Sequence, residues 1–139
     1  MDPLIFKQIK MEILEFILKA IDAPDAFHKT KIEATEAAIG ALGKFVLYQS
    51  EINDQNSEDL LLKFLDLLPL KDDADETQAT HRMLLEEILA KNIYLTSGSQ
   101  KVQDTLVRVV KIIRNVDESN PDLEILDDYS RDLIKKIIS

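Results

Sequence analysis

The chain has 139 residues, a net charge of −9, 45% apolar residues and no cysteine. The length suits one compact domain or about three helical repeats, and the lack of cysteine excludes disulfides, thiolate metal sites and a cysteine nucleophile. The acidic charge disfavours nucleic acid and favours basic partners, although many soluble proteins are acidic for solubility alone. Few glycines and prolines and no alternating strand pattern predict an all-α chain.

The first predicted helix begins at Asp2-Pro3, where an N-cap residue precedes a proline at the first helical position. Charged residues at helical spacing interrupt its apolar run, which argues against a signal peptide or membrane span and favours a soluble, intracellular protein. After a loop, a second helix is predicted over about 30–49. Its Gly40 and Gly43 predict close packing against a neighbouring helix.

Four more helices are predicted over 57–68, about 73–91, about 100–114 and 120–138. The fifth begins at about Gln100, after a loop at 96–99, and the sixth begins at Asn120-Pro121, which repeats the cap-plus-proline pattern of the first helix. The six helices pair into three antiparallel hairpins, at about 2–49, 57–92 and 100–138, within a single unit, 1–139.

The predicted helices alternate between two types. In the first type, Leu14, Leu18 and Ile21 recur 46 residues later as Leu60, Phe64 and Leu67, and after another 46 as Leu106, Val110 and Ile113. In the second type, Ala37, Ala41, Leu42 and Val46 recur 42 residues later as Ala79, Met83, Leu84 and Ile88. Alternation at this period is typical of HEAT-like hairpins, which stack into a solenoid with a concave face. We therefore expect a HEAT-like α-solenoid fragment with a binding surface and no catalytic pocket.

Residues that could carry chemistry are few. The acidic run 72–76 lacks the glycine and the twelfth-position ligand of an EF-hand, so we interpret it as a cap for the following helix. His28 and His81 lack metal-ligand spacing, and His81 is expected at the surface or in a groove. The aromatic side chains are expected in or beside the core. The sequence therefore predicts no enzyme, no cofactor and no metal site.

Two segments resemble a known family. Ala34–Lys44, and Leu67–Asp73 followed by Glu76, Thr80-His81 and Leu84-Leu85, are similar to consecutive HEAT repeats of the importin-beta (karyopherin-beta) nuclear transport receptors. Their order and spacing, over roughly residues 10–93, most resemble the C-terminal repeats of the importin-five (karyopherin beta-3) subgroup. The resemblance implies a longer receptor that carries cargo with basic segments into the nucleus. It also implies a Ran-type GTPase bound through repeats upstream of this chain, nucleoporins as further candidate partners, and a location in cytoplasm and nucleus or at the nuclear pore.

In such a solenoid the second helix of each hairpin lines the concave face. Carboxylates that point away from the core stripe there would meet Lys and Arg side chains of a cargo. The candidate cargo-binding residues are Glu36 on the second helix, and Glu76, Thr80 and Glu87 on the fourth.

The alternative is a free-standing helical-repeat scaffold for protein–protein interaction, unrelated to transport. Such a scaffold needs a first helix with a polar outer face as a cap. Leu4, Ile5 and Ile9 would instead leave an apolar patch, through which we expect a weak homodimer that strengthens as salt screens the net charge. Direct nucleic-acid or membrane binding is not expected.

Overall fold

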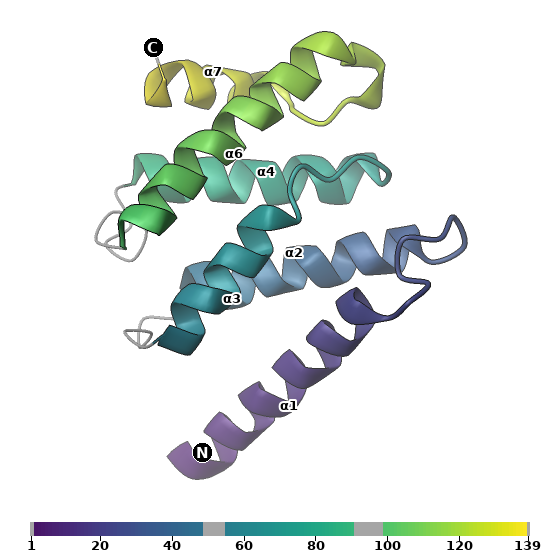
Figure 1. The fold of residues 1–139 in the computed structure, drawn as a ribbon, viewed down its shortest axis with the longest axis vertical. Helices are drawn as coiled ribbons and strands as arrows, with labels where there is room; N and C mark the ends of the chain where they lie inside the picture. Colours follow the sequence, from purple (N-terminus) through teal and green to yellow (C-terminus); the bar gives the residue numbers. More distant parts are fainter. Residues whose placement is uncertain (1, 49–54, 91–98, 139) are drawn as a thin grey trace.

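The computed structural model describes residues 2–48, 55–90 and 99–138, and across these residues the fold is all-α with no β-strand (Figure 1). The helices are α1 (Pro3–Asp22), α2 (Ile32–Tyr48), α3 (Gln55–Asp66), α4 (Ala74–Leu89), α6 (Gln100–Ser119) and α7 (Asp128–Ile137), with a short 3-10 helix η1 (Pro121–Leu123) before α7. The predicted all-α class is confirmed. Within these ranges, no helix has the length and apolar character that crossing a membrane requires.

The helices form two layers. Figure 1 shows α1, α3 and α6 running in one direction in one layer, with α2, α4 and α7 behind them in the other. Neighbours within a layer touch, since α3 contacts α6, and α4 contacts both α2 and α7. The layers are joined by contacts of α2 with α1 and α3, and of α6 with α7. The two helix types that alternate along the sequence thus occupy different layers.

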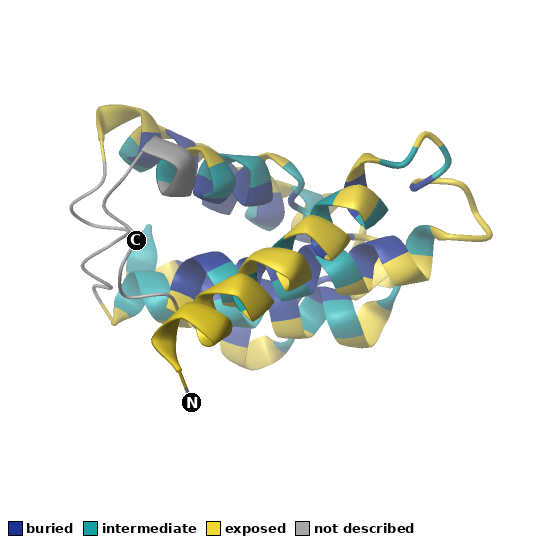
Figure 2. Ribbon diagram, turned by 90° about the horizontal axis from the view of Figure 1, so that it is seen from below, coloured by how far each residue is buried: buried dark blue, intermediate teal, exposed yellow. Residues whose placement is uncertain are grey.

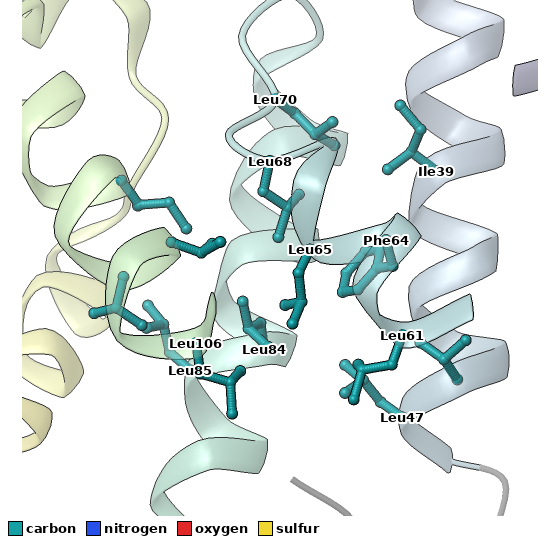
Figure 3. Packing of buried hydrophobic residues seen from close by; sticks show 14 of the residues in the cluster. Ile39, Leu47, Leu61, Phe64, Leu65, Leu68, Leu70, Leu84, Leu85 and Leu106 are labelled. Carbon is teal, nitrogen blue, oxygen red and sulfur yellow. The ribbon is translucent and has the colours of Figure 1, made fainter. Parts of the chain in front are cut away.

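The hydrophobic core lies between the layers. Phe64 and Leu65 of α3 are fully buried and extend toward α2 and α4 (Figure 3). The Phe64 ring lies so close to Gly43 that a Cβ there would stand 2.6 Å from two ring carbons. The close packing predicted for this glycine is therefore confirmed.

Local capping signals explain most helix starts. The Asp2 carboxylate accepts a hydrogen bond from the Leu4 N–H at 2.9 Å, and the Asp73 carboxylate accepts one from the Glu76 N–H at 3.2 Å. These contacts satisfy N–H groups that the first turn of a helix leaves free. The capping role predicted for the acidic run 72–76 is thus confirmed at Asp73.

The predicted start of the last helix at Asn120-Pro121 is wrong. Pro121 opens only η1, which ends at Glu124 in the left-handed conformation, with φ 51°. A helix cannot continue through that conformation. The chain enters α7 only after Asp127, whose carboxylate accepts the Ser130 N–H at 2.7 Å. The helix before it, α6, continues to Ser119 instead of ending near residue 114.

The expectation that the aromatic side chains lie in or beside the core is wrong for most of those described. Phe64 is fully buried and Phe45 is half-buried, whereas the exposed aromatic residues are Phe6, Phe16, Phe27, Tyr48 and Tyr129. Tyr94 lies outside the described residues. The aromatic residues of α1 are exposed because only one side of this helix packs on the rest of the chain. Figure 2 shows that α1 is exposed along most of its length.

Candidate functional site

A groove of about 250 Å³ lies between α2 and α4. Its lining combines four charged residues with an aromatic ring, a thioether and two small side chains: Lys44, Glu76, Arg82, Glu86, Tyr48, Met83, Ala79 and Thr80. Two of the charges are positive and two are negative. The groove is therefore a mixed polar and apolar surface, and it lies in the helix layer that the sequence pattern predicts to face a partner.

One end of the groove is acidic and aromatic. The Tyr48 side chain is 60% exposed. Partial burial raises the pKa of its hydroxyl, and the carboxylates of Glu87 and Glu86 raise it further. Glu86 lines the groove together with Tyr48. An aromatic face beside two carboxylates suits a lysine or arginine side chain, through cation–π attraction and charge-assisted hydrogen bonds.

The positive charge of Arg82 is directed out of the groove toward α7. Its Nη1 donates to the Asp127 carboxylate at 2.7 Å, and its Nε lies 3.9 Å from the Glu86 carboxylate. Burial opposes ionisation of Asp127, but hydrogen bonds from Ser130 and Arg82 outweigh it and hold the pKa of Asp127 below its ordinary value. Arg82 therefore ties α4 to the start of α7, and its charge is largely balanced there.

The groove brings together two of the four predicted cargo-binding residues, Glu76 and Thr80, but not in the predicted state. Glu87 is not among the residues that line it, although its charge acts on Tyr48. Glu76 and Glu87 are half-buried. The expected exposure of Thr80 is wrong, because Thr80 is 2% exposed and its hydroxyl donates to the Glu76 carboxylate at 3.4 Å. Thr80 can therefore support Glu76 but cannot reach a partner directly.

The expected exposure of Glu36 is also wrong. Its side chain is 3% exposed, and its carboxylate accepts backbone N–H groups from the turn between α3 and α4. Oε2 accepts from Lys71 at 2.9 Å, Oε1 accepts from Asp73 at 2.7 Å, and Asp72 donates to both oxygens at 3.2 Å. Glu36 holds this turn against α2, so its carboxylate is not available to a cargo.

His81, expected at the surface or in a groove, is fully buried. Its Nε2 accepts the Leu70 N–H at 3.1 Å, and its Nδ1 lies 2.8 Å from the Ile125 carbonyl oxygen. This pairing requires a neutral ring protonated on Nδ1. Burial lowers the pKa of His81 to about 4, which keeps the ring neutral at physiological pH. His81 therefore joins two turns, and in the described part of the chain no His, Asp and Glu cluster could hold a metal ion.

Sequence reasoning missed Lys44, Tyr48 and Glu86 as groove residues. The signal was present, because Lys44 and Tyr48 lie one helical turn apart on α2 and Glu86 directly precedes Glu87 on α4. Tyr48 was assigned to the core because aromatic residues usually contribute to it.

No protein-family model, curated protein or solved structure matches the chain. The features of this chain that bear on function are therefore the groove and the arrangement of the helices.

Proposed function

We propose that this chain is a HEAT-like helical-repeat segment that binds a basic segment of a partner protein, non-covalently, in the groove between α2 and α4. The alternation of two helix types in two layers supports the HEAT-like arrangement. The observation that carries the binding proposal is the exposed Tyr48 ring, which shares the groove with Glu86, and the charges of Glu86 and Glu87 both act on the Tyr48 hydroxyl. A lysine or arginine side chain would lie against the ring with its charge directed at the carboxylates.

The partner class follows from charge as well as from shape. The net charge of −9 raises the local concentration of cationic partners and speeds their encounter. Transport of basic cargo into the nucleus, in cytoplasm and nucleus, is the form of this proposal that the resemblance to importin-beta receptors favours. In that form a Ran-type GTPase would act through repeats upstream of this chain, nucleoporins would be further partners, and no catalytic step is involved.

The test measures binding of a fluorescent Lys/Arg-rich peptide by anisotropy, at low salt and at physiological salt. A Glu-rich peptide of the same length is the specificity control. Replacing Glu86 and Glu87 by glutamine should weaken binding between about 2-fold and about 30-fold, since an exposed ion pair contributes about 0.2–1 kcal/mol. The matched control replaces Glu12 and Glu15 on α1, which removes the same charge from an exposed helix outside the groove.

The comparison of the two variants decides between a site and a diffuse charge effect. A site in the groove predicts that only the Glu86/Glu87 variant loses affinity. Equal losses in both variants would mean that the peptide responds to net charge alone. Equal binding of the basic and acidic peptides would contradict the proposal and favour a scaffold with another kind of partner.

A further inference from the structure

We propose that the groove between α2 and α4 selects an extended segment in which charges alternate, with Lys or Arg at the first and fifth positions and Asp or Glu at the third. This inference rests on the proposed function, because it specifies the partner of the same groove. It goes further in requiring an acidic residue between the two basic ones, at a fixed spacing. The groove supplies both the order of the charges and the distance between them.

The two helices that form the groove are in contact and run in the same direction. Figure 1 shows that α2 and α4 begin on the same side of the molecule. A Cβ added at Gly40 would collide with the Glu76 carboxylate. A Cβ added at Gly43, three residues further along α2, would stand 2.9 Å from the end of Met83. Positions along α2 therefore locate the side chains of α4 along the groove.

Three charged positions follow one another along the groove at intervals of one helical turn. The Glu76 carboxylate lies against Gly40, and Lys44 and Tyr48 follow Gly40 on α2 by four and by eight residues. Glu86 shares the groove with Tyr48, and its charge acts on the Tyr48 hydroxyl. Since an α-helix rises about 1.5 Å per residue, each interval is about 6 Å. The groove thus presents an anion, then a cation, then an anion together with an aromatic ring.

The charges at these three positions can be reached by a partner. The charge of Arg82, the other cation of the groove, is balanced by α7 and by Glu86, whose carboxylate lies 3.9 Å from its Nε. Lys44 is exposed, and within the described ranges neither Lys44 nor Glu76 forms an ion pair. The side chain of Glu86 remains 49% exposed. Lys44 is therefore the cation that a carboxylate of the partner would meet.

An extended segment places its side chains at nearly the same interval. Residues of a strand rise about 3.2–3.4 Å each and alternate between two faces, so the first, third and fifth side chains share a face at steps of about 6.5 Å. Two steps span about 13 Å, against about 12 Å in the groove, and flexible lysine side chains absorb the difference. A basic residue then meets Glu76, an acidic residue meets Lys44, and a second basic residue meets Glu86.

A helical partner would repeat at about 6 Å through every fourth residue, but this groove suits a helix less well. Helices that dock in grooves do so through an apolar stripe of several large side chains. The uncharged part of this lining offers only Tyr48, Ala79, Thr80 and Met83, in a volume of about 250 Å³. A short helix is also marginal in water and would have to fold on binding. The extended conformation is therefore the one that we assign to the partner.

NMR titration of the isotope-labelled chain, at physiological salt, measures even the weak binding expected of a short peptide. The matching peptide carries Lys, Glu and Lys at positions one, three and five of a Gly/Ser background. Its isomer carries Glu, Lys and Lys at the same positions. Because composition and net charge are identical, general attraction to the chain of charge −9 is the same for both. The matching peptide should bind about 2- to 10-fold more tightly, which corresponds to one or two exposed ion pairs.

A charge reversal in the groove tests the middle position. Lys44→Glu makes all three positions acidic, so this variant should bind the two isomers equally. The matched control is Lys111→Glu, which makes the same change at an exposed lysine of α6 in the other layer and should keep the preference. Circular dichroism shows whether each variant is folded. A preference that survives in Lys44→Glu, or that both variants lose, would contradict the assignment of the middle position.

The remaining outcomes separate this inference from the proposed function. If the parent chain binds the two isomers equally, or binds neither while it binds the Lys/Arg-rich peptide, charge alternation is wrong and the groove remains a site for basic segments. If a helical peptide with Lys, Glu and Lys at positions one, five and nine binds more tightly than the matching peptide, the extended conformation is wrong. If no basic peptide binds, both proposals fail together.

Discussion

Acidification should destabilise this fold through His81. The ring is fully buried, and its neutral form accepts the Leu70 N–H and donates to the Ile125 carbonyl. A proton on Nε2 would remove the first hydrogen bond and place a charge in the core. The folded chain therefore resists protonation until the pH approaches about 4, whereas the unfolded chain accepts the proton near 6.5.

The sign and size follow from linkage between protonation and folding. Above pH 6.5 His81 is neutral in both states and the stability does not depend on it. Between pH 6.5 and about 4 only the unfolded state gains the proton, so the free energy of unfolding falls as the pH falls. From pH 7.5 to 4.5 this loss amounts to about 2–3 kcal/mol, since each pH unit between the two pKa values contributes about 1.4 kcal/mol.

Urea unfolding followed by circular dichroism at several pH values in this window measures the effect. The His81→Gln variant keeps a polar side chain but cannot titrate, so it should be less stable at neutral pH and show a flatter pH dependence. His28→Asn removes the other histidine, which lies exposed in the turn after α1, and should leave the wild-type dependence intact. Parallel pH curves for the parent and His81→Gln, or a native His81 that titrates near 6.5 by NMR, would refute this reasoning.

Two further substitutions test packing around α2. Glu36→Gln should lower the free energy of unfolding by about 1.5–3 kcal/mol, because it removes charged hydrogen bonds to the turn at 71–73. The control Glu33→Gln, on the exposed side of α2, should change the free energy of unfolding by less than about 0.5 kcal/mol. Gly43→Ala should destabilise by about 1–2 kcal/mol in urea unfolding, because the cost of overpacking against Phe64 exceeds the gain of about 1 kcal/mol in helix propensity. Gly40→Ala should cost less, since the added Cβ meets the movable end of the Glu76 side chain, and an equal cost at both glycines would contradict this account.

The features that sequence predicts well here are local. The start of α1 at Asp2-Pro3 and the start of α6 after Ser99 follow from capping chemistry within three residues. The alternation of two helix types follows from apolar periodicity. The start of α7 was mistaken because Asn120 and Asp127 both suit an N-cap, and the left-handed Glu124 between them is not marked by a glycine.

The site was predicted less well because its residues depend on distant partners. Helical spacing placed Glu36 away from the apolar stripe of α2, which normally indicates exposure. Its partners lie 35 to 37 residues further along the chain, in a turn that folds back over α2. His81 likewise pairs with Ile125, 44 residues away. A single sequence shows that such a residue is polar, but it does not show which distant turn folds back to form hydrogen bonds with it.

The turn before α4 and the turn before α7 are held by side chains at equivalent positions of the repeat, but the two turns cannot replace each other. Glu36 and Gln78 lie 42 residues apart, the period of their helix type, and each holds the turn that leads to the next helix of its layer. Their hydrogen bonds have opposite polarity. Glu36 accepts N–H groups, which the chain leaves free just before α4 begins, whereas Gln78 donates its amide to the Glu124 carbonyl at 2.8 Å. A carboxylate at position 78 would repel that carbonyl, and an amide donor at position 36 would face other donors. Each side chain therefore matches only its own turn.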